Sequence, residues 1–514
     1  MKKTQKKPVF RSNNQNQQML LPPSLEEIID RNHPVRLINK IIDDLNIDVL
    51  YKLYEGNGAP AYDPRTMLKI LFYAYTSNIY SSRKIEAAVK ENVTFMWLAS
   101  MQRPDHNTIN NFRSNRLKDV LKDIFSELVL ELNRQGQLSI KDIYTDGTKI
   151  EANANRYTFV WANSIRNRKE KILERLEELW NYADQVTNGE MIEACPTEAE
   201  ELTAEKVSKM IDNLNNKLKD LKIDKKIKKQ IAYGKKNYPE QLERYAKQEE
   251  DLGGRNSYSK TDNDATFMRM KDDHLKKGQV KAAYNVQIST NNQYVVDYTV
   301  HQTAGDTTTL IDHILNHEFY YGELPEQVTA DAGYGSEENY VFAENNNIEA
   351  FVKYNTFYQE SKRKWKEDIY RSENLEYNPD TDSFSCPIGK PMVKIETYEK
   401  ITKTGFKQEI SVYRAQNCEG CPLREECYEG AGNRRIYVNH NVRRLRKKAK
   451  EKLNSPEGLA KRSRRPIEPE SVFGNIKQNK NFKRFMLRGI EKVTIEVGLL
   501  SIAHNLGKFS RAAA

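Results

Sequence analysis

Two aspartates stand at the ends of predicted strands, where a sheet can hold them rigidly. Asp146 ends a stretch whose apolar residues alternate with period two, and Asp331 directly follows the run Gln327–Ala330. Glycines come soon after both, so the loops leave room for a substrate. Clustered carboxylates are hard oxygen ligands that suit Mg²⁺. The pair therefore indicates a magnesium-dependent active site, although one such aspartate alone is more often a turn residue or a helix cap.

Four of the five cysteines lie in one short segment. Cys418 and Cys421 form a C-x-x-C pair, Cys427 follows them, and Cys386 opens the segment in a Cys-Pro-Ile-Gly turn. Four thiolates could converge on one structural Zn²⁺, and the alternative is a group of reduced thiols without a metal. Cys195 stands apart in a predicted helical segment, and we expect it to contribute nothing.

Composition excludes several classes of protein. The 28 Tyr, 17 Phe and 4 Trp residues supply core material, which excludes global disorder. No apolar run approaches the roughly 18 residues that cross a bilayer, so we expect no membrane span. The basic start, Met1–Lys7, is not followed by the apolar stretch of a secretory signal, which favours a cytoplasmic location. The 82 Lys plus Arg against 72 Asp plus Glu give a formal charge of +10, a mild hint of an anionic partner.

The first hundred residues predict a helical domain, because apolar residues recur there at helical spacing. Asp105 is a good N-cap for a helix that reaches Ser114. Its polar face would carry Asn110, Asn111 and Arg113, which suits a helix-turn-helix-like reader of DNA bases. A helical packing or dimerisation domain is an equally open interpretation.

Strand patterns on both sides of a long polar stretch predict an interrupted α/β core. The polar stretch favours an inserted pair of long helices, most simply a solvated coiled-coil arm. Asn291 and Asn292 predict a hairpin turn in the resumed strands, and Ile490–Leu506 is apolar nearly all round, so it should be buried. The expected multidomain chain comprises a helical N-terminal domain at 24–135, an α/β core at 140–163 and 270–354, the helical insertion at 164–260, a cysteine module at 376–436, and a basic segment with C-terminal catalytic helices at 440–510.

Three segments resemble the carboxylate regions of the DDE transposases of bacterial insertion sequences. IYTDGTKIEANANRYTFVW, Ile143–Trp161, resembles the first region, and TADAGYGSEENY, Thr329–Tyr340, resembles the second. EPESVFGNIKQNKNFKRFMLRG, Glu468–Gly489, resembles the third. The stretch Asn32–Arg116, which contains PDHNTINNFR, is similar to the N-terminal domain of the same group. The resemblance covers most of the chain in the right order.

The resemblance implies a ribonuclease H-like core with a helical insertion after its first strand. Asp146, Asp331 and one glutamate would hold two divalent ions, Mg²⁺ or Mn²⁺. One ion would activate water or a DNA 3′-hydroxyl, and the other would stabilise the leaving oxygen, with no covalent protein intermediate. The implied partners are double-stranded DNA at the terminal inverted repeats, target DNA, and a second copy of the chain on paired ends.

Glu468 and Glu470 compete for the third position. Pro469 suits the first position of a helix, which would make Glu468 the capping residue and place Glu470 in the first turn. In the related signature a lysine follows the catalytic glutamate by seven positions, as Lys477 follows Glu470, and Phe473 would share their face. We therefore predict Glu470.

The same signature expects a tyrosine and an arginine upstream of the glutamate. This chain has Ser463 and Pro466 at those places. Arg464 or Arg465 would then take the arginine's role.

Cations gather around the predicted third carboxylate. Alone they would indicate a solvated charged helix, but beside a metal-dependent nuclease core they favour DNA binding. The cations that we predict to bind DNA are Arg443, Arg444, Arg446, Lys447, Lys448, Arg464, Arg465, Lys477, Lys483, Arg484 and Arg488.

The leading hypothesis is an active transposase that cleaves and joins DNA at the ends of its own element. The alternative is a catalytically inactive DNA-binding regulator derived from one. A zinc-stabilised coiled-coil scaffold is a third interpretation, and it leaves the two strand-end aspartates unexplained.

Overall fold

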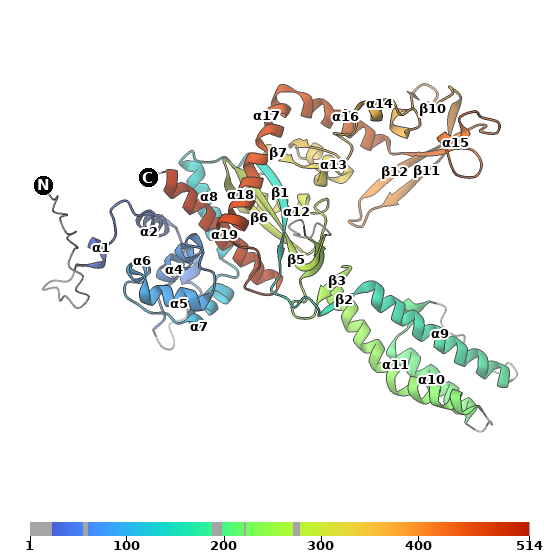
Figure 1. Ribbon diagram of the computed structural model, residues 1–514, viewed down its shortest axis with the longest axis horizontal. Coiled ribbons are helices and arrows are strands. Elements are labelled where there is room, and N and C mark those ends of the chain that lie inside the picture. The colour runs from blue at the N-terminus through green and yellow to red at the C-terminus, as the bar shows by residue number, and fades with distance from the viewer. Residues whose placement is uncertain are drawn as a thin grey trace, which may run out of the picture.

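The computed structural model describes residues 23–54, 60–187, 198–219, 221, 223–270 and 278–512. These form an N-terminal helical region, an α/β core, a helical arm and a C-terminal module with its own sheet (Figure 1). Cys195 lies outside the described residues. None of the described helices is both long enough and apolar enough to cross a bilayer.

The N-terminal region is helical, as its periodicity predicted. Its helices are α1 (Leu25–Ile28), α2 (Pro34–Asp44), α3 (Asp48–Tyr51), α4 (Pro64–Thr76), α5 (Ser82–Glu91), α6 (Val93–Leu98), α7 (His106–Asn111) and α8 (Leu121–Arg134). Asp105 caps α7 as expected, since its side chain accepts a hydrogen bond from the Thr108 amide at 2.8 Å. A π-turn, Phe112–Arg116, continues α7.

The core is a mixed sheet with helices beside it. Its strands are β1 (Asp142–Glu151), β4 (Thr266–Arg269), β5 (Val280–Asn291), β6 (Tyr294–His301), β7 (Gln327–Ala330) and β8 (Glu349–Val352). The order is β4-β5-β1-β7-β8, and β6 pairs with β5. β5 runs antiparallel to β1 and to β6, whereas β7 is parallel to both β1 and β8. Helices α12 (Leu310–Tyr321) and α13 (Glu337–Asn345) follow β6 and β7, and a 3₁₀ turn, Ala332–Tyr334, lies between β7 and α13.

The predicted hairpin joins β5 to β6. Asn292 and Gln293 both have positive φ angles, 48° and 60°. Two such residues make the turn whose twist matches that of the flanking strands, and asparagine adopts this conformation more readily than most residues.

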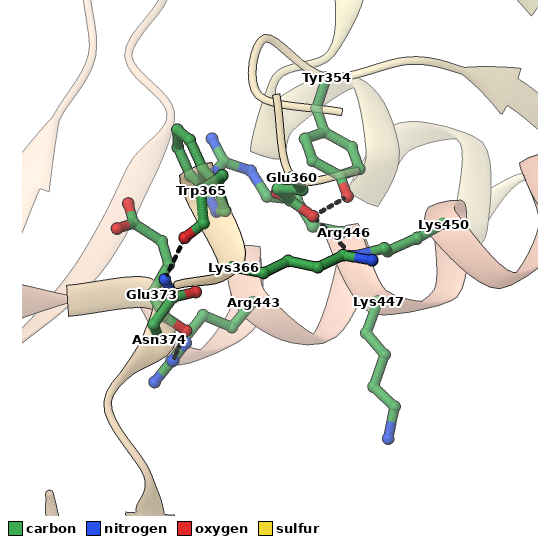
Figure 2. Close-up of a pocket in the computed structure, with 10 residues that line it drawn as sticks. All are labelled: Tyr354, Glu360, Trp365, Lys366, Glu373, Asn374, Arg443, Arg446, Lys447 and Lys450. Carbon is green, nitrogen blue, oxygen red and sulfur yellow. Dashed lines mark hydrogen bonds and ion pairs between the residues drawn. The ribbon is translucent and has the colours of Figure 1, made fainter. Parts of the chain in front are cut away.

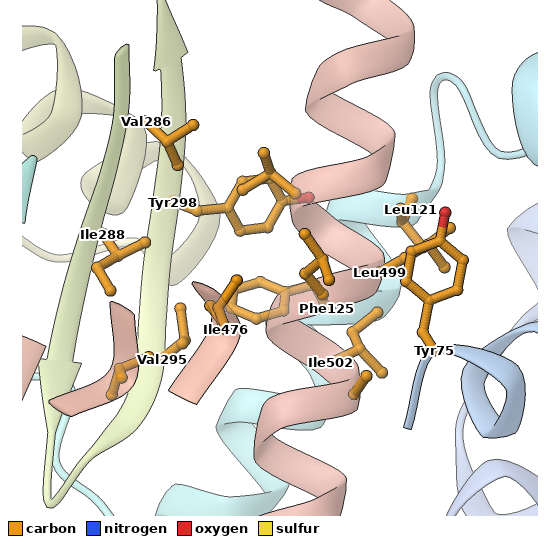
Figure 3. Close-up of a cluster of buried hydrophobic side chains, with 14 of the residues drawn as sticks. Tyr75, Leu121, Phe125, Val286, Ile288, Val295, Tyr298, Ile476, Leu499 and Ile502 are labelled. Carbon is orange, nitrogen blue, oxygen red and sulfur yellow. The ribbon is translucent and has the colours of Figure 1, made fainter. Parts of the chain in front are cut away.

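Helix α19 (Ile490–Ala512) is buried on nearly all sides, which confirms the prediction from its apolar sequence. Figure 3 shows it with the sheet residues Val295 and Tyr298 on one side and Tyr75 of α4 on the other. The ring of Phe125 in α8 contacts that of Tyr298, with the ring centroids 5.0 Å apart. A Cβ on Gly498 would lie 2.4 Å from the Tyr298 hydroxyl oxygen, so only glycine permits this close approach. Because one continuous hydrophobic cluster includes all these elements, the N-terminal helices and the α/β core share a single core.

The insertion forms an arm with a separate hydrophobic core. It contains α9 (Ala162–Val186), a 3₁₀ turn (Ala199–Glu201), α10 (Ala204–Leu218) and α11 (Lys225–Leu252), and at its base β2 (Phe159–Trp161) pairs with β3 (Ser257–Ser259). The predicted pair of long helices is therefore wrong in number, because three are present among the described residues. The first half of α11 is lysine-rich and has few apolar residues, so its helical period was faint in the sequence.

The C-terminal module contains an antiparallel sheet that the sequence did not suggest. Its strands are β9 (Tyr377–Asn378), β10 (Ser383–Ser385), β11 (Pro391–Ile401), β12 (Lys407–Ala415) and β13 (Arg435–Val438), ordered β13-β12-β11-β10-β9. Short helices α14 (Arg363–Lys366) and α15 (Arg424–Cys427) and a 3₁₀ turn (Ser372–Asn374) accompany it. The chain then continues as α16 (His440–Asn454), α17 (Pro456–Arg464), a π-turn (Pro466–Glu470), α18 (Ser471–Gly474) and a second π-turn (Asn475–Asn479).

Candidate active site

Neighbouring parallel strands bring Asp146 and Asp331 to one edge of the sheet. In the register of β1 and β7, Tyr144 lies opposite Thr329. Each aspartate follows two residues beyond this pair, so both stand at the same level. The sheet therefore holds the two side chains close together. Asp331 follows the end of β7 as predicted, but the prediction that Asp146 ends a strand is wrong, because pairing with β5 continues β1 as far as Glu151 and places Asp146 opposite Ile288.

Arg465 joins these aspartates to Glu470. Its Nη2 atom lies 3.1 Å from Asp146 Oδ1 and 3.5 Å from Asp331 Oδ2, and its Nη1 atom lies 3.0 Å from Glu470 Oε1. The Arg465 side chain is 10% exposed, whereas that of Glu470 is 51% exposed. Three carboxylates from three distant segments thus meet around one guanidinium, which offsets their mutual repulsion.

A π-turn sets the direction of Glu470. The turn Pro466–Glu470 widens the helix by one residue per turn, and residues five apart then lie one above the other. Arg465 and Glu470 are five apart and are hydrogen-bonded at 3.0 Å. The arginine stands one position earlier than the related signature expects, and the extra residue of the π-turn compensates for that offset.

The predicted helix start at Pro469 is wrong. The helical stretch begins earlier, at Pro456, where the Ser455 side chain accepts from the Gly458 amide at 3.0 Å. Pro469 therefore lies inside the π-turn. Glu468 is not a capping residue: it is 3% exposed, and its Oε2 accepts from the Gln293 amide at 2.8 Å.

A fourth carboxylate, Asp306, lies beside the two aspartates, and sequence reasoning missed it as a functional residue. Asn285 and Gln287 of β5 donate to Asp306 Oδ1 at 2.8 and 3.0 Å. A Cβ on Gly147 would come within 2.7 Å of the same oxygen, so the glycine after Asp146 makes room for it. The signal in the sequence was the pair of polar residues, Asn285 and Gln287, alternating within a largely apolar strand.

Tyr334 is a buried residue next to the carboxylates of this site. Its hydroxyl donates to Gln287 Oε1, and the side chain is fully buried. Burial raises the pKa of Tyr334 well above its ordinary value, and the nearby charges of Asp306, Asp146 and Asp331 raise it further. The phenol therefore stays protonated and donates to Gln287, which in turn donates to Asp306.

Some cations of α16 bind other residues of the protein, and others are exposed to solvent. Arg444 and Lys448 both bind Glu344, the arginine with two bonds of 2.9 and 2.7 Å. Arg443 is partly buried and donates to the Glu373 carbonyl at 3.1 Å. Lys447 is exposed. Most of the predicted DNA-binding residues of α16 thus have protein partners in this state.

A basic pocket of about 320 Å³ lies along one side of α16. Figure 2 shows Arg446, Lys447 and Lys450 beside it, with Lys450 bound to Glu360 at 2.9 Å. The complete lining is Tyr354, Glu360, Trp365, Lys366, Glu373, Asn374, Arg443, Arg446, Lys447 and Lys450.

The cations after the second π-turn hold the loop that follows β1. Arg484 donates to the carbonyls of Ala152 and Ala154 at 3.1 and 2.8 Å, and Arg488 donates to that of Asn153 at 2.8 Å. The other predicted DNA-binding cations of this region differ in exposure: Lys483 is exposed, whereas Lys477 is partly buried. Arg464 is exposed, and its Nη2 lies 3.5 Å from Asn292 Oδ1. Arg484 and Arg488 therefore tie the C-terminal segment to the strand that carries Asp146.

The prediction that Arg113 lies on an exposed helix face is wrong. The residue is 2% exposed, and it donates to the Tyr80 carbonyl at 2.7 Å and to the Tyr75 hydroxyl at 3.2 Å. The same Tyr75 hydroxyl donates to buried Glu496 at 3.3 Å. The π-turn after α7 rotates Arg113 inward, toward this distant glutamate. Asn110 and Asn111 remain exposed, so their predicted base contacts stay a prediction.

The four clustered cysteines are partly buried free thiols. Arg434 approaches two of them: its amide lies 3.4 Å from Cys418 Sγ and its Nη1 lies 3.0 Å from Cys427 Sγ. Cys386 and Cys418 pack against the small core of the module. The described residues do not arrange these thiols as a metal site.

The carboxylate site has the donor chemistry for hard divalent ions. As the side chains stand, no group of three or more His, Cys, Asp or Glu residues within the described ranges is close enough to share a metal ion. At the sheet edge, Arg465 lies between the carboxylates. Because these oxygens already converge on one positive charge, the set fits a cation-binding role.

Two family models match the chain. A transposase domain matches residues 23–115, and a transposase DDE domain matches residues 385–510. The second match contains Arg465 and Glu470, whereas Asp146 and Asp331 lie outside both. No curated protein and no solved structure matches the chain.

Proposed function

The chain belongs to the DDE transposases of insertion sequences, and on that premise we propose that it cleaves and joins DNA at the ends of its own element. The observation that carries this proposal is the meeting of Asp146, Asp331 and Glu470 around Arg465. Two carboxylates from the sheet and a third from a neighbouring helical turn give the clustered oxygen ligands that metal-dependent phosphodiester chemistry requires.

The catalytic core is proposed to be ribonuclease H-like. Its support is the strand arrangement, in which β1 is flanked on one side by the antiparallel hairpin β5–β6 and on the other by the parallel strands β7 and β8. The helical arm leaves the core after β1, as the resemblance implied.

Asp146, Asp331 and Glu470 are the residues proposed to hold two Mg²⁺ or Mn²⁺ ions. When bound, such ions activate water or a DNA 3′-hydroxyl and stabilise the leaving oxygen of an in-line displacement. Asp306 lies close enough to add negative charge to the site. Arg465 holds the carboxylates together by charge, and because a guanidinium also matches a phosphate, it suits a contact with the DNA backbone.

The proposed partners follow from the same reaction. The chain would bind double-stranded DNA at the terminal inverted repeats and at the target, and work in the cytoplasm as a homodimer on paired ends. A structural zinc at the four cysteines is a further proposal, supported by their clustering in one small module and by the C-x-x-C pair Cys418 and Cys421. No observation favours the inactive regulator, because all three carboxylates are present and converge.

Mapping nicks on defined DNA tests the proposed function. The full chain is incubated with Mg²⁺ and duplexes that carry the element's ends, with scrambled ends as the control. We expect nicks at the element boundary that depend on Mg²⁺ and on the end sequence. Equal nicking of scrambled duplexes, or none on either, would contradict the proposal.

A further inference from the structure

A concentrated positive charge lies in the helical arm, far along the chain from the catalytic segments. Residues 217–236 contain nine lysines and two aspartates, a formal net charge of +7 in a chain whose total is +10. The lysines are Lys217, Lys219, Lys222, Lys225, Lys226, Lys228, Lys229, Lys235 and Lys236. Most of the chain's positive surplus therefore comes from one stretch of twenty residues.

The described residues of this stretch lie at the outer end of the arm. Helix α11 begins there at Lys225 and returns to β3, beside the core (Figure 1). Its 28 residues span about 42 Å at 1.5 Å per residue. The lysines at the start of α11 therefore lie well away from the part of the sheet that carries Asp146.

The outer face of α11 presents a ridge of cations. Ile231 and Tyr238 are buried against the arm's own core. Lys225, Lys229 and Lys236 recur at i, i+4 and i+11, so they share the opposite face, and all three are exposed. These three residues define the lysine ridge.

The ridge is not neutralised by the neighbouring helices. Lys235, on the flank, is paired with Asp212 at 2.8 Å. In the part of the chain that the structure describes, none of the three ridge lysines makes an ion pair with an acidic side chain. By contrast, α9 of the same arm carries five basic and five acidic residues. Positive and negative side chains together are enough to keep an arm soluble, so solubility does not require a cluster of lysines. Clustered positive charges repel one another unless an anionic partner compensates them.

We propose that the lysine ridge binds the backbone phosphates of duplex DNA, without reading sequence, outside the DNA held at the active site. This inference rests on the proposed function, which supplies DNA as the partner. The ridge covers about 16 Å, and beside that length B-DNA carries about ten phosphate charges. The arm's length corresponds to about 12 base pairs, so the contact would fall on DNA beyond the cleaved step.

A matched pair of triple variants of the full chain tests the ridge. Lys225→Gln/Lys229→Gln/Lys236→Gln removes its charge. Lys171→Gln/Arg175→Gln/Lys247→Gln removes the same charge from exposed positions elsewhere on the arm. Affinity for a random duplex of about 30 base pairs is measured between about 50 and 200 mM salt.

The salt dependence gives the answer. Each lost phosphate contact makes the slope of log affinity against log salt shallower by about 0.9. Because the ridge variant lacks three lysines, its slope should be shallower than that of the unchanged protein by about 2.7. The control variant should keep its slope. Equal slopes for the ridge variant and the unchanged protein would overturn the proposal, and so would an equal loss in the control.

Cleavage separates this inference from the proposed function. On an end duplex of about 12 base pairs, which is too short to follow the arm, the ridge variant should nick as well as the unchanged protein. Loss of nicking on that short duplex would contradict a contact restricted to distant DNA. Absence of nicking by the unchanged protein would contradict the proposed function instead, while the salt slopes would still decide on the ridge.

Discussion

Glu468 and Glu470 are two residues apart, yet they face different surroundings. Glu468 is buried and accepts from the Gln293 amide at the β5–β6 turn, whereas Glu470 is half exposed and binds Arg465 at 3.0 Å. The π-turn that contains both separates their directions. One glutamate therefore anchors the helix to the sheet, and the other faces Asp146 and Asp331.

Arg113 should matter for stability. Its positive charge faces Glu496, which is fully buried, and burial raises the pKa of that glutamate. Arg113→Met should lower the free energy of unfolding by about 3 to 5 kcal/mol, because it leaves a buried charge without its partner. Denaturant unfolding measures this, with Asn111→Ala as a control that should change stability by about 0.5 kcal/mol or less. A loss of DNA specificity with unchanged stability would instead support the original prediction of a base contact.

Asp306 should tune the binding of divalent ions. Asp306→Asn keeps the shape of the side chain and an oxygen that can accept from Asn285 and Gln287. It removes one negative charge next to the carboxylates, so the Mg²⁺ concentration for half-maximal nicking should rise by about tenfold. A Mg²⁺ titration of nicking checks this. An unchanged half-maximal concentration would show that Asp306 serves only the hydrogen-bond network.

Metal analysis of the purified chain tests the cysteine module. We expect about one zinc per chain, held by Cys386, Cys418, Cys421 and Cys427. Binding must rearrange the thiols and release the Arg434 contact on Cys427. A zinc content near zero in a fully folded preparation would rule this out, and Cys195→Ser is the matched control that should leave the content unchanged.

Lys480 should make stability depend on pH. Burial lowers the pKa of Lys480 to about 8. In the unfolded chain the pKa of this lysine is about 10.4. Between pH 8 and that value, Lys480 is protonated in the unfolded chain and largely neutral in the folded one, so the free energy of unfolding should increase as pH rises through this window. Lys480→Met should stabilise the protein at pH 7 by up to about 3 kcal/mol and flatten the pH dependence. Unfolding of both proteins across the window checks this, and parallel pH curves would contradict it.

Local patterns predicted the parts of the site that local physics decides. Period-two alternation placed Asp146 on a strand, and the run Gln327–Ala330 placed Asp331 at the end of one. The asparagines predicted the hairpin, and an all-apolar helix predicted the burial of α19. The π-turn was not predictable in the same way, because Pro456 and Pro469 are both good helix starts and only the fold selects between them.

Long-range partners explain the other differences. Arg113 has the sequence spacing of a polar face, and only its approach to Tyr75 and distant Glu496 shows why it is buried. Asp306 has no motif of its own, because it acquires its place from amides on β5. Charge partners across the fold are invisible to periodicity.

Nicking by Glu470→Gln and Glu468→Gln, each with parallel measurement of Mg²⁺ binding, tests the central claim most directly. Glu470→Gln removes one charge but little volume, so folding and DNA binding should survive while ion binding and nicking fall together. Glu468→Gln can still accept from the Gln293 amide, so it should cost stability of only about 1 kcal/mol and retain nicking. Full nicking by Glu470→Gln together with none by Glu468→Gln would contradict the assignment.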